Sequence, residues 1–253
     1  MSRSDCPPTS GLVVAVALNV MVVAVAAIWF PGDPPVKLTI GTIDGLVRFE
    51  GTPPLSRPIH TAVGALPPQP SVAVNPRGRL GNVLVWISRG LDAEPSESLS
   101  APRALLDQRH YAFVPRVVVV QVGQPLAIRN SDPTMQRAKF SSTHNGVFSI
   151  GLPGRSTLEY ERIFDRPEIG IRVSGERHPW MRAYVHVVEH PYHAVTGEDG
   201  RFRFAKLPAG KYELSFWHES LALEPDKQKV VVTVGERPIK PIVVTYSRAS
   251  FEH

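Results

Sequence analysis

Apolar residues recur at every second position in short runs of this chain, and Pro and Gly separate the runs. Residues 201–204 and 212–216 alternate in this way on either side of a Pro208-Ala209-Gly210 turn signal. A period of two places alternate side chains on opposite faces of a strand, so a hairpin of a half-buried sheet is expected over 196–217. With 25 Pro and 19 Gly in 253 residues, and no long amphipathic helix pattern after residue 35, the sequence predicts an all-β fold of sandwich type.

The other expected strands are short and are spread over the chain beyond residue 37. They cover 38–50, 82–88, two strands within 111–130 with a turn at 122–125, 137–142, 156–164, 168–174, 182–188, 229–234 and 241–246. Residues 55–78 are rich in Pro and lack periodicity, and 92–102 are polar, so both stretches are expected to be loops.

Residues 11–30 form an apolar run that contains no charge and one strongly polar side chain, Asn19. Twenty residues of helix cover about the 30 Å of a bilayer core. We therefore expect a short cytoplasmic N-terminus (1–10), an uncleaved transmembrane anchor (11–30) and a linker (31–40), with Arg3 favouring the cytoplasmic side. A cleavable signal peptide is the alternative, although its apolar core usually has only about 7–15 residues.

This topology decides where the single cysteine lies. Cys6 precedes the anchor, so the membrane-anchored protein would have its bulk in the periplasm, or outside the cytoplasm in general, without any thiol. Neither a disulfide nor a thiolate metal ligand is then available to the exported part.

Charge and motifs exclude several classes of function. The net charge is +5, but the basic residues are scattered and no run of five or six occurs, so nucleic-acid binding is not expected. No Gly-x-Ser-x-Gly, phosphate-binding loop or His-Glu-x-x-His motif is present, so we do not expect an enzyme.

The stretch 196–217 resembles the carboxypeptidase regulatory-like domain, a small transthyretin-like sandwich. The resemblance is carried by Thr196, Asp199-Gly200, Phe202, Leu207-Pro208, Gly210 and Tyr212. It implies a structural or interaction domain without catalysis. Residues 41–47 and 82–87 fit the first two strands of such a domain.

Residues 107–193, with an extension to Trp217-His218-Glu219, resemble a bacterial cupredoxin-like family of the plastocyanin and methylamine-utilization type, a Greek key sandwich. The matching residues are Asp107-Gln108, Pro115, Val122-Gly123-Gln124, Asn130-Ser131-Asp132, Asn145, Phe148, His178-Pro179-Trp180-Met181 and His190-Pro191-Tyr192.

The resemblance implies a copper site of two His, one Cys and one Met, and this chain departs from it systematically. Gln136 stands at the first His position and Gly175 at the Cys position, so only His178 and Met181 remain. A blue-copper site depends on its thiolate. We therefore expect a degenerate, metal-free domain with no cofactor, in which Gln136 hydrogen-bonds His178. The alternative is an atypical copper-binding or electron-transfer protein that uses His178 and Met181.

Two further groups of residues are candidates for a site. Arg116, Arg137, Lys139 and Arg177 fall at or beside metal-site positions of the family, which predicts either a salt-bridged surface or a basic surface for an anion or acidic partner. Four histidines lie near the junction of the two patterns: His186, His190, His193 and His218. Three of them, His190, His193 and His218, could form a zinc or copper site with Glu219, or all four are hydrogen-bonded residues at a domain interface.

The two resemblances interleave along the chain. We expect residues 41–103 to supply the first strands of the regulatory-like sandwich, 104–190 to be an inserted cupredoxin-like domain, and 191–247 to complete the first sandwich. Alternatively, 38–90 contributes the first strands of the cupredoxin. The expected function is a membrane-anchored extracytoplasmic binding or structural protein, whose partners are the membrane and an envelope protein or a saccharide.

Overall fold

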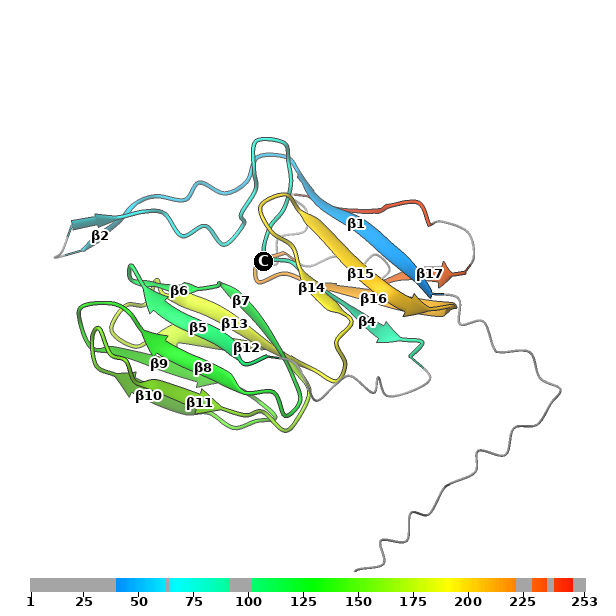
Figure 1. Ribbon diagram of the computed structural model, residues 1–253. Coiled ribbons are helices and arrows are strands. Elements are labelled where there is room, and N and C mark those ends of the chain that lie inside the picture. Colours follow the sequence, from blue (N-terminus) through cyan, green and yellow to red (C-terminus); the bar gives the residue numbers. More distant parts are fainter. Residues whose placement is uncertain (1–39, 62–63, 92–101, 222–228, 236–238, 248–253) are drawn as a thin grey trace, which may run out of the picture. The chain divides into compact units, whose positions relative to one another are not determined.

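The computed structural model describes residues 40–247 apart from 62–63, 92–101, 222–228 and 236–238. Every regular element among these residues is a strand, and the sheets stack in pairs (Figure 1), which confirms the prediction of an all-β fold of sandwich type. The expected anchor at 11–30 and Cys6 lie outside the described residues. Within them, no helix has the length and apolar character needed to span a membrane.

The outer sandwich is formed by the beginning and the end of the described chain. Its first sheet has the order β15-β1-β18, with β15 Arg201–Pro208, β1 Ile40–Glu50 and β18 Ile242–Ser247. Its second sheet has the order β14-β4-β16-β17, with β14 His193–Val195, β4 Leu84–Arg89, β16 Gly210–Trp217 and β17 Lys229–Val234. The core between them includes Ile43, Ile87, Phe204 and Tyr246.

The inner sandwich contains the strands from 104 to 188. The five-stranded sheet has the order β10-β9-β12-β13-β7: β10 Phe148–Leu152, β9 Gln136–Ser141, β12 Glu168–Gly175, β13 Arg182–Val188 and β7 Val117–Gln121. The four-stranded sheet has the order β11-β8-β5-β6: β11 Glu159–Arg162, β8 Leu126–Asn130, β5 Ala104–Arg109 and β6 Ala112–Val114. Phe140, Phe164 and Ile128 are among the side chains of a separate core.

Strand pairing shows how the chain passes between the sandwiches. β1 pairs antiparallel with β15 and parallel with β18, both of which follow the inner sandwich in sequence. β4 and β14 pair with each other, and Trp86 lies opposite His193. This pairing brings together the two ends of the segment that contains the inner sandwich. The segment 104–188 therefore builds its own two sheets between strands of the outer sandwich.

Two local expectations were wrong. β15 and β16 do not form a hairpin: β15 pairs with β1, whereas β16 pairs with β4 and β17, so Pro208-Ala209-Gly210 carries the chain from one sheet to the other. The apolar face of each strand is buried in the same core, which period-two alternation cannot distinguish from a shared sheet. The expected loop at 55–78 contains the short hairpin of β2 Ile59–Thr61 and β3 Gly64–Leu66.

The motif at 196–212 has structural roles in the outer sandwich. The Thr196 hydroxyl accepts a hydrogen bond from the Val83 amide (3.0 Å) and donates one to the Leu80 carbonyl (2.9 Å). The ring of Phe202 lies directly over Gly45, where an added Cβ would be 2.0 Å from the ring carbon Cζ. Position 45 therefore has room for Gly alone.

Contacts between the two sandwiches centre on Trp217. Its ring lies 4.4 Å from that of His186 and 5.0 Å from that of Tyr184, both on β13. Beside it, Arg116 and Glu219 form a bidentate ion pair, with 2.8 Å between Nη2 and Oε2. Only 14% of the Arg116 side chain and 3% of the Glu219 side chain are exposed, so this ion pair is largely shielded from water.

Replacing Glu219 by Gln is expected to lower the free energy of unfolding by about 3–5 kcal/mol, because the Arg116 charge would remain buried without its partner. Urea denaturation of the full-length chain followed by tryptophan fluorescence measures the effect. The matched control is Glu176→Gln, which breaks the exposed pair with Arg137 and should cost about 0–1 kcal/mol. Equal effects of the two substitutions would contradict the structural importance of the buried pair.

Candidate functional site

The loop between β12 and β13 holds the residues that the sequence singled out. The Gly175 amide donates to the Met181 carbonyl (3.0 Å), and the Met181 amide donates to the His178 carbonyl (2.9 Å). The Glu176 amide donates to the Arg137 carbonyl of the neighbouring β9 (3.0 Å). These bonds draw the loop into a tight turn at one end of the inner sandwich.

The tight turn leaves no space for a side chain at position 175. A Cβ added to Gly175 would lie 2.8 Å from the His178 carbonyl oxygen and 3.1 Å from the Met181 Cβ. The first of these distances is below any ordinary contact, and the atom concerned is backbone, so the loop would have to shift. A Cys at this position, as the resemblance requires for copper, does not fit the present turn.

Gln136 has a different partner from the one predicted. Its side chain is buried, and its Nε2 donates to Asp132 Oδ2 (3.3 Å) instead of to His178. Asp132 also accepts from the Tyr111 amide at 3.1 Å and is itself buried. Burial raises the pKa of Asp132, and the hydrogen bonds from Tyr111 and His110 and from Gln136 act against that rise. Sequence reasoning missed this role, whose only signal was the place of Asp132 in the Asn-Ser-Asp motif.

His178 and Met181 lie in different surroundings. The half-buried His178 ring packs edge-on against Tyr111 (5.2 Å between ring centroids) and lies tilted against Trp180 (4.8 Å). Burial lowers the pKa of His178, Asp132 acts to raise it and Arg177 lowers it further. Met181 is fully buried in the core, with its Sδ 3.5 Å from the position of a Cβ on Gly175. No group of three or more His, Cys, Asp or Glu side chains in the described part of the chain is arranged to hold a metal ion.

A segment of the outer sandwich reaches this end of the inner one. The Tyr111 carbonyl accepts hydrogen bonds from Trp180 Nε1 (3.2 Å) and from Gln69 Nε2 (2.9 Å). A hollow of about 300 Å³ lies beside these contacts, lined by Trp180, Arg116, Arg182 and residues between 54 and 72. The aromatic groups around His178 are thus fixed from both sandwiches.

The four predicted basic residues do not form one surface. Arg116 is not available as a surface cation, because its guanidinium is bound to Glu219 and mostly buried. Arg137, Lys139 and Arg177 are exposed, and Arg137 lies 3.5 Å from Glu176. The structure therefore contradicts the membership of Arg116 in a basic surface, since its side chain points toward the interface between the sandwiches.

The four histidines near the junction hold structural positions. His186 and His218 are buried, and their Nδ1 atoms accept hydrogen bonds from the amides of Gly170 (3.0 Å) and Ser220 (3.2 Å). In His190 it is Nε2 that contacts a backbone oxygen, the carbonyl of Ile87 at 2.7 Å. His193 Nδ1 lies 3.3 Å from the His190 carbonyl oxygen, so all four rings contact backbone groups.

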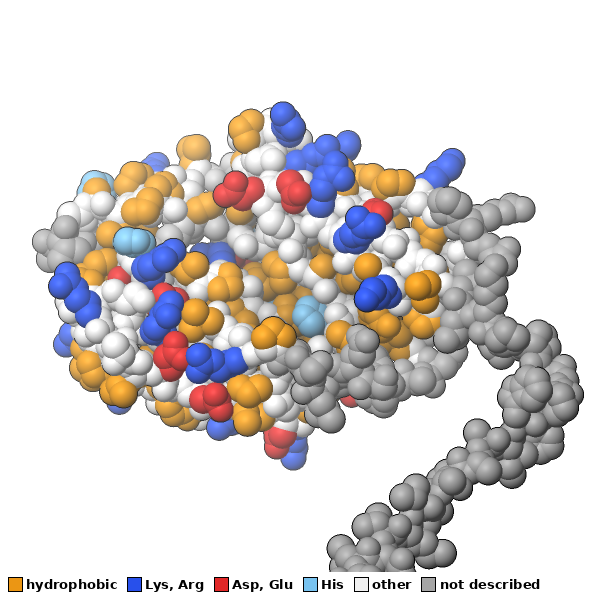
Figure 2. All heavy atoms as spheres, in the orientation of Figure 1, with side chains coloured by type: hydrophobic (Ala, Val, Ile, Leu, Met, Phe, Trp, Pro, Cys, Tyr) orange, Lys and Arg blue, Asp and Glu red, His pale blue; other side chains and the backbone are white. Residues whose placement is uncertain are grey.

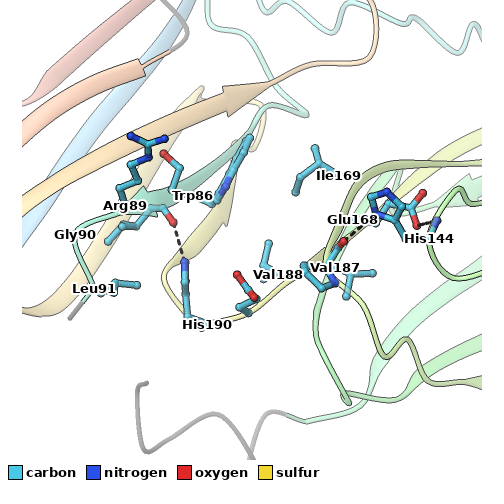
Figure 3. A pocket seen from close by; sticks show the side chains of 14 residues that line it. Trp86, Arg89, Gly90, Leu91, His144, Glu168, Ile169, Val187, Val188 and His190 are labelled. Carbon is cyan, nitrogen blue, oxygen red and sulfur yellow. Dashed lines mark hydrogen bonds between the residues drawn. The ribbon is translucent and has the colours of Figure 1, made fainter. Parts of the chain in front are cut away.

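A cleft of about 440 Å³ lies between β4 of the outer sandwich and the loop and strand ends of the inner one. Figure 3 shows Trp86, Arg89 and His190 on one side, Ile169, Glu168 and His144 on the other, and Val188 between them. Ile169 is 36% exposed, and Trp86 is half-buried, so both present apolar surface to the cleft.

The polar groups of the cleft differ in how many hydrogen bonds they make within the protein. Glu168 accepts hydrogen bonds from Ser142, Thr143, His144 and Asn145, which lower its pKa to about 2 although burial acts to raise it. In His190, Nε2 donates to a carbonyl, so Nδ1 is an acceptor, and it is buried without a protein partner. The exposed side chains of Arg89 and Glu189 give the cleft both donors and acceptors for a ligand with hydroxyl groups.

No protein-family model and no curated protein matches the chain. Several solved cupredoxin structures are similar at low identity. A purple cupredoxin from Nitrosopumilus maritimus is 17% identical, covers 33% of this chain and 98% of its own, and has a TM-score of 0.28. An amicyanin from Paracoccus versutus is 14% identical and covers 41% of this chain and 96% of its own (TM-score 0.30).

The third comparison is with a copper-containing nitrite reductase from Thermus scotoductus SA-01, which is 16% identical and has a TM-score of 0.31. The match covers 56% of this chain and 28% of that enzyme. At such identities and TM-scores these likenesses carry no argument about what this chain binds.

The buried histidines predict that the protein loses stability in acid. Burial lowers the pKa of His186 to about 3 and that of His218 to about 4, from 6.5. Below pH 6.5 the unfolded chain therefore binds more protons than the folded one, and the free energy of unfolding falls with pH, by about 1.4 kcal/mol per unit of pKa difference for each group. Protonation also removes the acceptor that each Nδ1 offers to a backbone amide.

Urea denaturation between pH 7 and pH 5 measures this slope. His218→Gln should flatten it, whereas the control His60→Gln, at an exposed position on β2, should leave it unchanged. A slope that is the same in wild type and His218→Gln would show that the buried ring does not govern the acid response.

Proposed function

We propose that this chain is a membrane-anchored extracytoplasmic binding protein whose inner sandwich is a cupredoxin-like domain that works without copper. The outer sandwich is, in this proposal, a carboxypeptidase regulatory-like domain. The observation that carries the proposal is the closed turn at Gly175, where a Cβ would lie 2.8 Å from a backbone oxygen. The position that supplies the thiolate in the resembling family therefore has neither the sulfur nor the space for it.

The neighbouring groups support a metal-free domain. Type 1 copper takes two imidazoles and a thiolate, with a weak axial thioether. Here the second imidazole is replaced by Gln136, whose amide is bound to Asp132, and the ring of His178 is packed between Tyr111 and Trp180. Gln136 thus has a protein partner for its amide, and the His178 ring lies in an aromatic environment.

The alternative is an atypical copper-binding or electron-transfer protein, and one observation favours it. Met181 Sδ lies 3.5 Å from the Cβ position at 175, so the thioether is still directed toward the place of the lost thiolate. Thioether and imidazole are ligands that suit Cu(I). A protein of this kind would use His178 and Met181.

Copper titration separates the two functions. We expect the purified full-length chain to bind neither Cu(I) nor Cu(II) stoichiometrically, and to show no absorption at about 600 nm, because that band needs a thiolate. Stoichiometric Cu(I) binding that disappears in His178→Ala, but persists in the exposed control His60→Ala, would overturn the metal-free function and establish the alternative.

Binding, not catalysis, is the activity we propose, and the cleft beside Trp86 is our candidate site for a saccharide. The half-buried indole of Trp86 offers an apolar surface to the C–H face of a sugar ring. The exposed carboxylate of Glu189 offers acceptors for hydroxyl groups. The cleft thus combines apolar surface with hydrogen-bonding groups, and a neutral saccharide requires both.

Titration with cellotriose, maltotriose and chitotriose, followed by tryptophan fluorescence, tests this site. At least one of them should change the fluorescence with a Kd in the millimolar range or below, and Trp86→Ala should abolish the response. The control Trp180→Phe lies outside the cleft and should retain it. If all three saccharides leave the wild-type fluorescence unchanged at about 10 mM, the cleft is not a saccharide site.

A further inference from the structure

The outward face of the five-stranded sheet gathers cations in a defined pattern. Lys139 on β9 lies opposite Ser174 on β12, which lies opposite Arg182 on β13, so these residues form one row across three strands. In the adjacent row Arg172 lies opposite Ser141 and Tyr184. The cationic face consists of four exposed residues, Arg137, Lys139, Arg172 and Arg182.

Three of these four cations have no carboxylate partner. Arg137 lies 3.5 Å from Glu176, but Lys139, Arg172 and Arg182 make no ion pair among the described residues. Arg172 is the diagonal neighbour of both other cations, at about 7–8 Å, where like charges repel. The repulsion between these like charges destabilises the protein when no partner is bound. An anionic partner would relieve it.

On the other sheet of the same sandwich, two cations are paired with carboxylates. Arg129 on β8 lies 2.9 Å from Asp107 on β5, and Arg103, just before β5, lies 2.7 Å from Glu159 on β11. Figure 2 likewise shows positive and negative side chains interspersed over the face that it presents. Three cations without an ion pair in the described part of the chain thus distinguish the cationic face from the other sheet of the same sandwich.

The spacing of the cations indicates the chemistry of the partner. Residues two apart on a strand, such as Arg137 and Lys139, are separated by about 6.8 Å, which is also the spacing of carboxylates at alternate positions of an extended polypeptide. The guanidinium groups of Arg172 and Arg182 suit bidentate binding of carboxylates. Ser174, between the two cations of the row, adds a hydroxyl for hydrogen bonding.

We propose that the cationic face binds an extended, carboxylate-rich segment of a partner protein. This inference rests on the proposed binding function and names the partner's chemistry. It keeps Arg137 and Lys139 of the expected basic surface. Arg116 and Arg177 are replaced by Arg172 and Arg182, which alternate with apolar core residues of β12 and β13. An acidic polysaccharide is the competing partner, and the experiment includes it.

The test uses the full-length chain and a fluorescein-labelled peptide of alternating Glu and Ser residues, with binding followed by fluorescence anisotropy. Binding is expected at about 20 mM NaCl and should weaken about tenfold at about 200 mM NaCl, because exposed charges are screened. The variant Lys139→Gln/Arg172→Gln/Arg182→Gln should bind at least about tenfold more weakly, which corresponds to about 1.4 kcal/mol.

The matched control is Arg48→Gln/Arg201→Gln/Lys206→Gln, which removes the same charge from exposed positions of β1 and β15 and should retain wild-type affinity. Equal losses of affinity in the two variants would mean that net charge alone governs peptide binding, and would overturn the proposal. Tighter binding of polygalacturonate than of the peptide would also overturn it, as would the absence of peptide binding at low salt. Copper binding by the 175–181 loop would leave this result intact and would refute only the metal-free function.

Discussion

The pairing of β4 with β14 is the constraint on which the arrangement of the whole described chain depends. These two strands flank the inner sandwich in sequence, and their pairing closes the long segment between them. Thr196 secures the same closure, because its hydroxyl joins the backbone at Leu80 and Val83. With the ends fixed, the intervening strands form sheets among themselves, and the outer sandwich is completed by β1, which reaches β15 and β18.

The same closure brings the outward face of β13 against Trp217 and places Arg116 beside Glu219. Removing these charges from water is costly, and only their bidentate geometry compensates for it. His186 and His218 share this environment and are therefore held neutral. The interface between the sandwiches thus depends on the protonation of His186 and His218. Neither residue belongs to the cleft beside Trp86 or to the cationic face. The turn at Gly175 is held by backbone hydrogen bonds and by the contact of Trp180 with the Tyr111 carbonyl.

Much of the fold was predictable because alternation of apolar residues is a local signal. The strands at 82–88, 168–174 and 182–188 were found within one or two residues, since each has a clear buried face. The partners of a strand are not local, and so β15 and β16 were wrongly joined into a hairpin. The site was predictable in its residues but not in its contacts: Gln136 was identified, whereas its bond to Asp132 depends on the depth at which both are buried.

The sequence by itself determined the all-β class, the absence of any thiol beyond Cys6 and the presence of Gly at position 175, because these follow from residue identity and period. Only the tertiary structure decided which cations are free. Arg116 and Arg182 look alike in the sequence, yet one is paired with Glu219 and the other is exposed beside Lys139 and Arg172. The physical reason is that an ion pair requires proximity, and residues separated by about a hundred positions meet only when the sheets have packed.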